Sequence, residues 1–349
     1  MRSLHSTCDV AVVGAGPAGI AAAEALVAGG AKVVLIDKHA RPGGKACGGG
    51  LTALAWERAH VDPAEPTPLG RAFAALEVHS PLGRRRLGAG GPIIVVVDRT
   101  AWQAQRIARL EERGALVRLG ERATGLEPGG VATERGRIDC GHVVGADGAS
   151  SRVRRLLGLE PGPGVRALQI EIAPSQAPGV DPSIPAVWFD PRRLGLGYAW
   201  AFPTADGAIR LGAGADARSV SAERLKRGFF DWLAAVGLAA SGVELASGTI
   251  RCGYAGHRFG RVRLAGDAAG LASPVTGEGI SQALASGEEA AREILEPGYR
   301  SPIIEALAVR HRRTHELLAV PYLGAALFAL APPLLGIRAI REAALRRYA

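Results

Sequence analysis

A glycine-rich turn between an apolar run and an alanine-rich segment constrains the fold of this chain more than any other feature. Residues 10–26 read VAVVGAGPAGIAAAEAL, in which Gly14, Gly16 and Gly19 form a GxGxxG pattern between a predicted strand and a predicted helix. A second predicted strand, KVVLID, ends at Asp37. Gly14 permits the tight turn, Gly16 lets a pyrophosphate approach the backbone, Gly19 lets the helix pack on the strand, and Asp37 can accept hydrogen bonds from a ribose. The sequence therefore predicts a dinucleotide site at a helix N-terminus.

Two later segments follow strand-like runs, and each carries an aspartate beside a glycine. GADGASSRVRR contains Asp147, and RVRLAGDAAGLASPVTGEGI contains Asp267. The second segment ends at Gly279-Ile280, where a helix is predicted to begin. The positive end of that helix would favour a group on which negative charge accumulates during reduction.

In this order the three segments resemble the FAD fingerprints of the p-hydroxybenzoate-hydroxylase-type flavoproteins. The resemblance implies bound FAD, with Asp267 on the ribityl chain and Asp147 near the pyrophosphate. It also implies a flavin contact for Arg99, the arginine of VVVDRTAW. The residues that we assign to the cofactor, with Gly48 and Gly49 taken from the CGGG motif described below, are Gly14, Gly16, Ala18, Gly19, Asp37, Lys38, Gly48, Gly49, Arg99, Asp147, Gly148, Asp267, Gly277, Gly279 and Ile280.

The source of electrons is left open by the sequence. No second GxGxxG in a strand–helix context follows residue 30, so the sequence shows no dedicated nicotinamide domain. The reducing equivalents come either from NAD(P)H that docks transiently on the FAD domain or from an electron-donor protein or small carrier.

The spacing of the three fingerprints implies a discontinuous cofactor domain. Residues 73–99 and 165–250 alternate apolar and polar positions between Pro/Gly turns, which is typical of strands. Residues 100–115 are predicted to form an amphipathic helix with Thr100 as its N-cap. We therefore predict an α/β fold, with a Rossmann-like FAD-binding domain, an inserted mainly β substrate domain and a short C-terminal helical segment. The predicted ranges are 1–72, 98–160 and 250–300 for the FAD domain, 73–97 and 161–249 for the substrate domain, and 301–349 for the C-terminal helices.

Two further motifs concern the substrate. The first places Cys47 before three glycines in the run CGGG, and the second is the alternating aromatic strand YAWAFP followed by LGAG. In the second motif the three aromatic side chains share one face of a strand, a pattern that a core strand also explains. In order, the motifs resemble the CGGG and YxWxFP…GxG motifs of the geranylgeranyl reductases, and the similarity extends from about residue 8 to residue 300. The residues that match the second motif are Tyr198, Trp200, Phe202, Pro203, Gly212 and Gly214.

This second resemblance implies a role for each motif. The glycines would lie against the flavin, Cys47 would stand beside the reacting carbons, and the aromatic row would line an apolar slot for a polyprenyl chain. Reduction of a C=C bond needs a hydride at one carbon and a proton at the other. A thiol of ordinary pKa near 8.5 is protonated at neutral pH, so Cys47 can donate that proton; the alternative is a purely structural cysteine. The expected substrate is a prenyl group of a lipid, diphosphate, quinone or secondary metabolite.

Three other functions compete with this prediction. FAD-dependent monooxygenases of apolar or aromatic metabolites share the fold and all three fingerprints, and no short motif separates them. Flavin halogenases have a loosely similar aromatic motif, but they depend on a lysine that is absent from residues 46–225. A lipid- or quinone-binding flavoprotein that only passes electrons has no need of a cysteine against the flavin.

Composition adds weaker constraints. The formal net charge is +9, carried almost wholly by arginine, which fits either an anionic partner such as a membrane or simply a GC-rich coding sequence. No recognised motif supports nucleic-acid binding. The four cysteines are far apart and form no CxxC pair, so we expect no metal site and no disulfide framework, as in a reducing compartment.

The last part of the chain combines apolar and basic character. LLAVPYLGAALFALAPPLL at 317–335 is apolar throughout, and arginines stand on both sides of it. It has three interpretations: a lid over an apolar channel, an interfacial segment on an anionic membrane, or a membrane span that its prolines disfavour. With no signal-peptide pattern at the start, we expect a cytoplasmic protein, with peripheral membrane contact as the open alternative.

Overall fold

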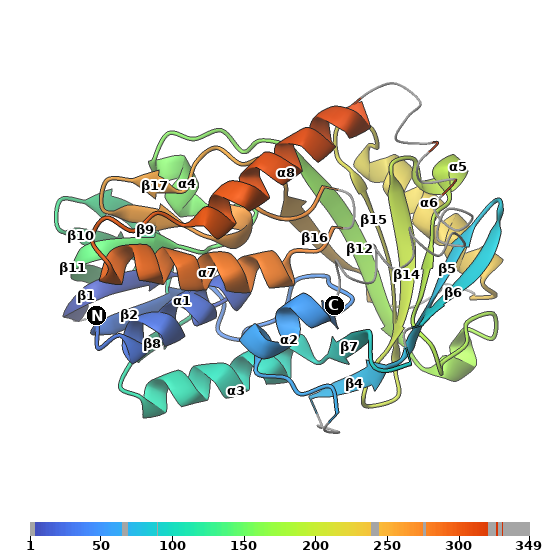
Figure 1. Cartoon of the computed structure of the whole chain (residues 1–349), viewed down its shortest axis with the longest axis horizontal. Coiled ribbons are helices and arrows are strands. Elements are labelled where there is room, and N and C mark those ends of the chain that lie inside the picture. Colours follow the sequence, from blue (N-terminus) through green and yellow to red (C-terminus); the bar gives the residue numbers. More distant parts are fainter. Residues whose placement is uncertain are drawn as a thin grey trace. The chain divides into compact units, whose positions relative to one another are not determined.

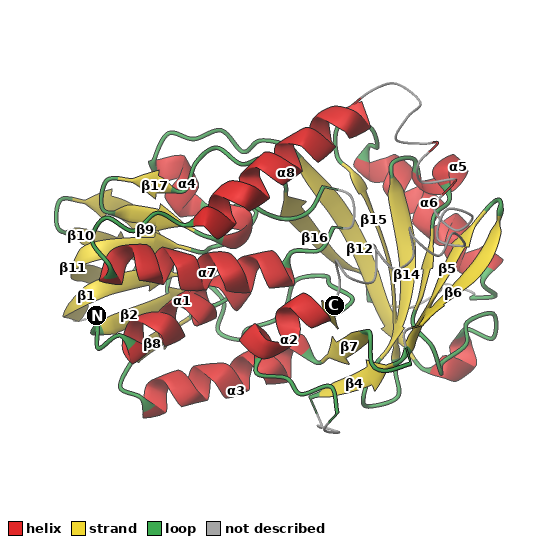
Figure 2. Cartoon of the chain, viewed as in Figure 1, coloured by secondary structure: helices red, strands yellow, loops and turns green. Residues whose placement is uncertain are grey.

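The computed structural model describes residues 4–64, 69–88, 90–238, 244–274 and 277–319, together with residues 326 and 330. The chain forms two compact units (Figures 1 and 2). Unit 1 comprises residues 1–44, 99–164 and 250–314, and unit 2 comprises residues 45–98, 165–249 and 315–349. The cofactor segments are thus discontinuous in sequence. Residues 45–72, which the sequence-based ranges placed with the cofactor, cluster with unit 2, and residues 301–314 cluster with unit 1.

Unit 1 contains a Rossmann-like sheet. Along its main path the strand order is β17-β18-β11-β1-β2-β8, and β1, β2, β8, β11 and β18 run parallel to their neighbours in that group. The antiparallel strands β9 and β10 extend the sheet from β11. The strand bounds are β1 Leu4–Val13, β2 Val33–Asp37, β8 Leu116–Leu119, β9 Ala123–Glu127, β10 Gly130–Thr133, β11 Gly136–Gly145, β17 Arg258–Phe259 and β18 Val262–Leu264.

Helices cover this sheet because its strands are apolar on both faces. Val10 and Val12 face one core, shared with α1 and α3, whereas Ala11 and Val13 face another. Helices α1 and α7 pack closely because Gly287 has no side chain; a Cβ there would stand 2.2 Å from the carbonyl oxygen of Ala18. The helix bounds are α1 Pro17–Ala28, α3 Arg99–Glu112, α4 Arg152–Leu156, the 3₁₀ turn η2 Gly266–Ala268, α7 Ile280–Leu295 and α8 Pro302–Ala319. The residues of α8 from His315 onward cluster with unit 2.

Unit 2 is built mainly on antiparallel strands, with a parallel pair of β13 and β5. Its seven-stranded sheet has the order β16-β12-β15-β14-β13-β5-β6, and a small sheet has the order β3-β7-β4. The strand bounds are β3 Gly50–Thr52, β4 Gly70–Phe73, β5 Ala75–Ser80, β6 Gly83–Gly88, β7 Ile94–Val97, β12 Gly164–Ile172, β13 Ala186–Trp188, β14 Gly197–Pro203, β15 Ile209–Asp216 and β16 Ala246–Arg251. The helices are α2 Ala53–Ala59, α5 Pro191–Leu194 and α6 Ala222–Ala235, with a 3₁₀ turn, η1, at Pro174–Gln176.

Two predictions from the sequence concern helices. The amphipathic helix predicted to begin after Thr100 begins at Arg99, so Thr100 lies in its first turn and the N-cap prediction is wrong. Most of the apolar run 317–335, for which the sequence left three interpretations, lies outside the described residues. Within the described part of the chain, none of the helices combines the length and the apolar character that crossing a membrane requires.

Candidate functional site

The GAGPAG turn and the GADG segment meet at the start of α1 in unit 1. Gly14 has φ +109°, and a Cβ there would stand 2.4 Å from the carbonyl oxygen of Ala146 and 2.7 Å from the Cα of Asp147. Gly19 is equally crowded, because its Cβ would stand 1.8 Å from the carbonyl oxygen of Gly14. Two of the three glycine roles predicted from the motif, the turn at Gly14 and the close helix packing at Gly19, are therefore visible as steric requirements.

The third fingerprint reaches the same place. A Cβ on Gly266 would stand 3.0 Å from the Cβ of Ala18, in the first turn of α1. The Oδ1 atom of Asp267 lies 3.5 Å from the position of a Cβ on Gly279, the N-cap of α7. No side chain caps α7 and no acidic residue stands in its first turn. Asp267 thus lies beside the N-cap of α7, and its neighbour Gly266 lies against the first turn of α1.

Two hydrogen-bonded tethers fix the turn itself. Asp37 accepts hydrogen bonds from the backbone N–H of Ala15 at 2.7 Å and of His39 at 2.8 Å. On the other side, Arg99 Nη2 donates to Gln103 Oε1 at 2.9 Å, and Gln103 Nε2 donates to the carbonyl oxygen of Ala15 at 3.0 Å. Sequence reasoning missed Gln103; its position four residues after Arg99 on the helix was the available signal.

Asp147 has a local task as well. Its carboxylate accepts hydrogen bonds from the Ser151 hydroxyl and from the backbone N–H groups of Arg152, at 2.6 Å, and Val153, at 3.2 Å. Burial raises the pKa of Asp147 above its ordinary value, against the lowering effect of these hydrogen bonds. The aspartate therefore fixes the N-terminus of α4 beside Gly14.

The residues of unit 1 fit FAD on geometric grounds. A Cβ on Gly16 would meet nothing within 4 Å, so the N-terminus of α1 is open for phosphate oxygens. Arg99 Nε is buried without a hydrogen-bond partner among the described residues, so this donor is available to a cofactor. Lys38 is exposed directly after Asp37. The remaining assigned residues of unit 1 occupy turns or helix starts: Gly148 with φ +77°, Gly277 with φ +61°, and Ile280 as the first residue of α7.

Unit 2 holds the cysteine loop against the aromatic strand. A Cβ on Gly48 would stand 2.6 Å from Phe202 Cδ2 and 3.2 Å from Trp200 Nε1. A Cβ on Gly49, which has φ +77°, would stand 2.5 Å from the carbonyl oxygen of Val97. The glycines thus let the loop lie directly on side chains of β14 and on backbone of β7. The half-buried Cys47 is fixed in this loop, since its Sγ accepts a hydrogen bond from the N–H of Gly49 at 3.4 Å.

The GxG that follows the aromatic motif is explained by strand register. Trp200 is paired with Gly212, and Tyr198 is paired with Gly214, on the antiparallel strands β14 and β15. A Cβ on Gly212 would stand 2.1 Å from Trp200 Cζ2, so only glycine leaves room for the indole ring. Tyr198 and Phe202 are half-buried and pack in the same cluster as Trp200, while Pro203 is the last residue of β14.

Arg210 joins the two motifs of unit 2 and was missed by sequence reasoning. It is paired with Phe202 across β14 and β15. Its Nη1 donates to the carbonyl oxygen of Val97 at 2.8 Å and lies 2.9 Å from the position of a Cβ on Gly49. Its Nε donates a hydrogen bond to Glu171 Oε2 at 2.7 Å. A single arginine, 11% exposed, therefore places positive charge beside the cysteine loop.

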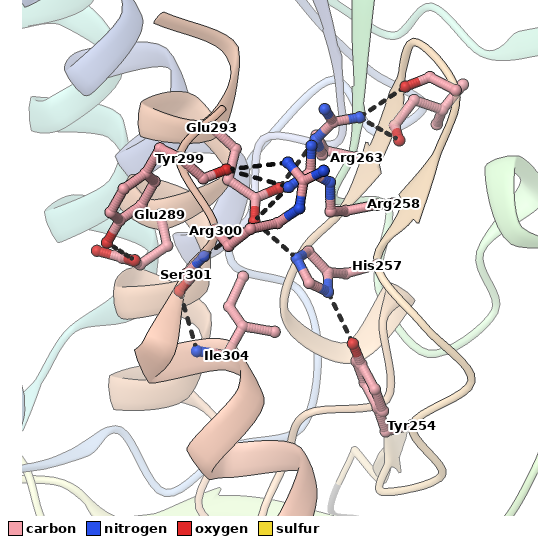
Figure 3. A network of polar contacts seen from close by, with 12 residues as sticks. Tyr254, His257, Arg258, Arg263, Glu289, Glu293, Tyr299, Arg300, Ser301 and Ile304 are labelled. Carbon is pink, nitrogen blue, oxygen red and sulfur yellow. Dashed lines mark hydrogen bonds and ion pairs between the residues drawn. The ribbon is translucent and has the colours of Figure 1, made fainter. Parts of the chain in front are cut away.

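A second feature missed from sequence is a buried polar network in unit 1 (Figure 3). At its centre the fully buried carboxylate of Glu293 accepts hydrogen bonds or pairs with charged groups: His257 Nε2 at 3.1 Å, Arg263 Nε at 3.0 Å, Arg258 Nη1 at 3.4 Å and the N–H of Ser301 at 3.1 Å. Burial alone would raise the pKa of Glu293, but its hydrogen-bonding and cationic partners hold it below the ordinary value. The network joins the end of α7 to the start of α8, and we assign it a structural role.

With the geometry established, comparisons with known proteins identify relatives. A family model described as FAD dependent oxidoreductase matches residues 9–123. The chain is 32% identical over 317 residues to digeranylgeranylglycerophospholipid reductase 1 of Methanopyrus kandleri, covering 82% of this chain and 80% of the relative. It is 30% identical over 329 residues to menaquinone reductase of Mycobacterium tuberculosis, covering 83% and 77%.

A solved structure supports the fold. A geranylgeranyl bacteriochlorophyll reductase-like protein of Thermoplasma acidophilum superimposes with a TM-score of 0.81 at 22% identity. The match covers 99% of this chain and 97% of that one. The α/β architecture predicted from the fingerprints is thereby confirmed.

Proposed function

The chain belongs to the geranylgeranyl reductase family of FAD-dependent oxidoreductases, and on this premise we propose that it saturates C=C bonds of a polyprenyl chain carried by a lipid. The observation that carries the proposal is the packing of the Cys47 loop on the aromatic strand β14 in unit 2, because it gathers a thiol and an apolar surface in one place. Two relatives at 30% identity or above have names that describe reduction of a geranylgeranyl lipid or of menaquinone.

The enzyme uses FAD, and unit 1 provides the residues to hold it. The N-terminus of α1 would bind the pyrophosphate, Asp37 would meet the ribose, and Asp267 would meet the ribityl chain. Arg99 would donate a hydrogen bond from its unpartnered Nε to the flavin. Bound FAD supplies the hydride that a reductase adds to one carbon of a double bond.

The protein's own part in the reaction is to supply a proton to the other carbon. We assign this role to Cys47. The N–H of Gly49 donates to the Cys47 Sγ and so fixes its direction, while a thiol that accepts this bond still carries a proton of its own to give. Arg210 and the glycines keep the loop flat against Phe202 and Trp200, so the thiol has a defined place on the apolar surface.

The partly buried aromatic side chains of unit 2 would line the slot for the prenyl chain. Tyr198, Phe202 and Phe189 are each packed against a buried cluster that includes Trp200, so they present an apolar and rigid surface. Because the proposed substrate is a lipid, we also propose that the protein makes peripheral contact with a membrane. The immediate reductant in this proposal is NAD(P)H, an electron-donor protein or a small carrier, because the sequence shows no dedicated nicotinamide domain.

Product analysis tests the proposal. The purified holoenzyme is incubated without oxygen with dithionite and a digeranylgeranyl glycerophospholipid in detergent, and the lipid is examined by mass spectrometry. We expect products heavier by successive pairs of hydrogens, with NADPH or NADH replacing dithionite if either is the donor. Parallel incubations contain a prenyl diphosphate or menaquinone in place of the lipid. If the flavin is fully reduced and none of the three compounds gains hydrogens in its prenyl chain, the proposal is contradicted.

A further inference from the structure

Unit 2 carries a surface hollow that the proposed reaction does not use. It has a volume of about 340 Å³ and is lined by residues of α5 and α6. The short helix α5 and the longer helix α6 lie side by side (Figure 1) and pack on β14 and β15. Four of the six lining residues are arginines: the lining consists of Arg192, Arg193, Arg224, Arg227, Gly228 and Asp231.

The fold brings these arginines together by packing two amphipathic elements. On α6, Leu225, Phe229 and Trp232 are buried in the core of unit 2, which turns Arg224 and Arg227, three residues apart, to the opposite and exposed side. Helix α5 approaches this side closely because residue 228 is glycine. A Cβ on Gly228 would stand 2.2 Å from the carbonyl oxygen of Arg193, so any other residue would separate the two helices.

Contacts at both helices hold parts of the lining in place. Asp190 caps α5, accepting hydrogen bonds from the N–H groups of Arg192 at 3.1 Å and Arg193 at 3.2 Å, and also pairs with Arg193 Nη1 at 2.5 Å. From the other helix, Arg224 Nη2 reaches to 4.0 Å from the position of a Cβ on Gly195, the residue that ends α5.

The charges of the hollow do not balance. Asp190 neutralises Arg193, but no carboxylate lies within 4 Å of Arg192, Arg224 or Arg227 among the described residues. Asp231 is the single acidic residue of the lining. Bringing like charges together costs free energy, and a bound anion would remove that cost. Guanidinium groups match tetrahedral phosphate oxygens in particular, because their planar fork donates two parallel hydrogen bonds.

We propose that this hollow binds phosphate groups through Arg192, Arg224 and Arg227. Its volume is at the lower end of the range of small-molecule sites, roughly 300–1,000 Å³, and its lining has no aromatic or aliphatic residue, which suits a charged head and not a prenyl chain. Phosphate occurs both in membrane phospholipids and in soluble phosphate esters and diphosphates, and the same three arginines would serve either source. The site is independent of the proposed reductase reaction.

The test compares two double variants of the FAD-loaded, full-length protein. R224Q/R227Q removes two charges from the hollow. R85Q/R86Q removes two equally exposed charges from β6 of the same unit and serves as the control. Inorganic pyrophosphate is titrated by calorimetry at low salt, and sedimentation is measured with vesicles of phosphatidylglycerol in phosphatidylcholine. Flavin absorbance and thermal melting verify that both variants are folded.

We expect R224Q/R227Q to weaken binding by about 10-fold or more in at least one arm, since each lost guanidinium removes a charge-assisted pair, and R85Q/R86Q to change it little. Loss of pyrophosphate binding identifies a soluble phosphate ester as the source. Loss of vesicle binding alone identifies lipid phosphate. Absence of binding in both arms, or equal losses in the two double variants, would overturn the proposal, because the arginines would then act only through net charge.

Discussion

In unit 1 the candidate cofactor site is made largely of backbone, whereas in unit 2 the candidate substrate site is made of side chains on neighbouring strands. Gly14 and Gly19 are required because carbonyl oxygens stand where their side chains would be. Gly48 and Gly212 are required because the rings of Phe202 and Trp200 stand there. Backbone cannot yield locally, but a ring can shift, so substitutions in the two units should differ in kind: loss of cofactor in unit 1 and graded loss of catalysis in unit 2.

The largest effect is expected for Gly19→Ala. Its Cβ would stand 1.8 Å from the carbonyl oxygen of Gly14, so the turn that faces the pyrophosphate must move. We expect a colourless protein that does not regain FAD on dialysis, measured by flavin absorbance per folded chain. Gly141→Ala, also in unit 1, meets its nearest atom at an ordinary 3.5 Å and should keep its FAD. A yellow Gly19→Ala protein with normal affinity would break the comparison between the units.

Cys47→Ser should produce the complementary phenotype. FAD content and thermal stability are expected to stay unchanged, while turnover of the prenyl substrate falls by about 100-fold, the usual scale for loss of a general acid. Cys252→Ala, which removes a buried thiol of unit 1, should leave turnover per flavin nearly unaffected. Full activity of Cys47→Ser would remove this thiol from the mechanism and leave it a packing role.

Glu293→Gln tests stability and not chemistry in unit 1. The substitution leaves His257, Arg258 and Arg263 without their buried anion, which typically costs about 3 kcal/mol. Glu296→Gln on the same helix removes an exposed pair with Arg292 and should cost at most about 0.5 kcal/mol. The free energies come from urea unfolding followed by flavin release. Equal costs for the two variants would mean that the network contributes no more than a surface ion pair.

Gly212→Ala should have a smaller effect confined to the substrate side. Because the ring of Trp200 must shift to admit the new methyl group, which would also stand 2.8 Å from the carbonyl oxygen of Leu168, the cost of overpacking is about 1–3 kcal/mol. We expect normal FAD content and a KM for the prenyl substrate raised several-fold. Gly91→Ala, in the same unit, meets no atom within 4 Å and should leave KM unchanged. FAD loss in Gly212→Ala would show that the two sites are not separable.

The smallest effect is a pH dependence of unit 1. Burial lowers the pKa of His311 from 6.5 to about 4, so the unfolded chain takes up a proton first as the pH falls. Above pH 6.5 His311 is neutral in both states and does not reduce the free energy of unfolding. As the pH falls from 6.5 toward 4, this free energy decreases, because only the unfolded chain is protonated at His311. Between pH 7 and 5.5 the loss should be about 1 kcal/mol. His311→Gln should show a flatter profile in urea unfolding; an unchanged slope would assign the effect to another group.

The predictability of the two sites from sequence follows the same division. Short motifs encode backbone geometry, so Gly14, Asp37 and Gly279 could be placed by their spacing alone. Partners that meet only in the fold carry no such signal. Gln103 contacts Ala15 from 88 positions away, and Arg210 contacts Val97 from 113 positions away.

The sequence pattern also misplaced the start of helix α3 and the unit to which residues 45–72 belong. Thr100 is a good capping residue, but α3 begins one residue earlier, at Arg99. Residues 45–72 follow the first β-α-β segment in sequence, yet hydrogen bonds between β3, β4 and β7 hold them in unit 2. The role of Gly212 required the register of β14 and β15, which a single sequence does not contain.

The most direct test of the central claim is an anaerobic single turnover. The holoenzyme is reduced stoichiometrically, freed of oxygen and mixed in a stopped-flow instrument with a digeranylgeranyl glycerophospholipid in detergent, with menaquinone, or with detergent alone. If the enzyme is a prenyl reductase, one of the prenyl compounds restores the yellow absorbance of oxidised flavin and gains a pair of hydrogens in its prenyl chain, while detergent alone does not. Hydrogens in the prenyl chain remain after air has reoxidised any quinol to the quinone. If the absorbance returns only when oxygen is admitted, and the prenyl compound then gains an oxygen atom, the enzyme is a monooxygenase and the account is wrong.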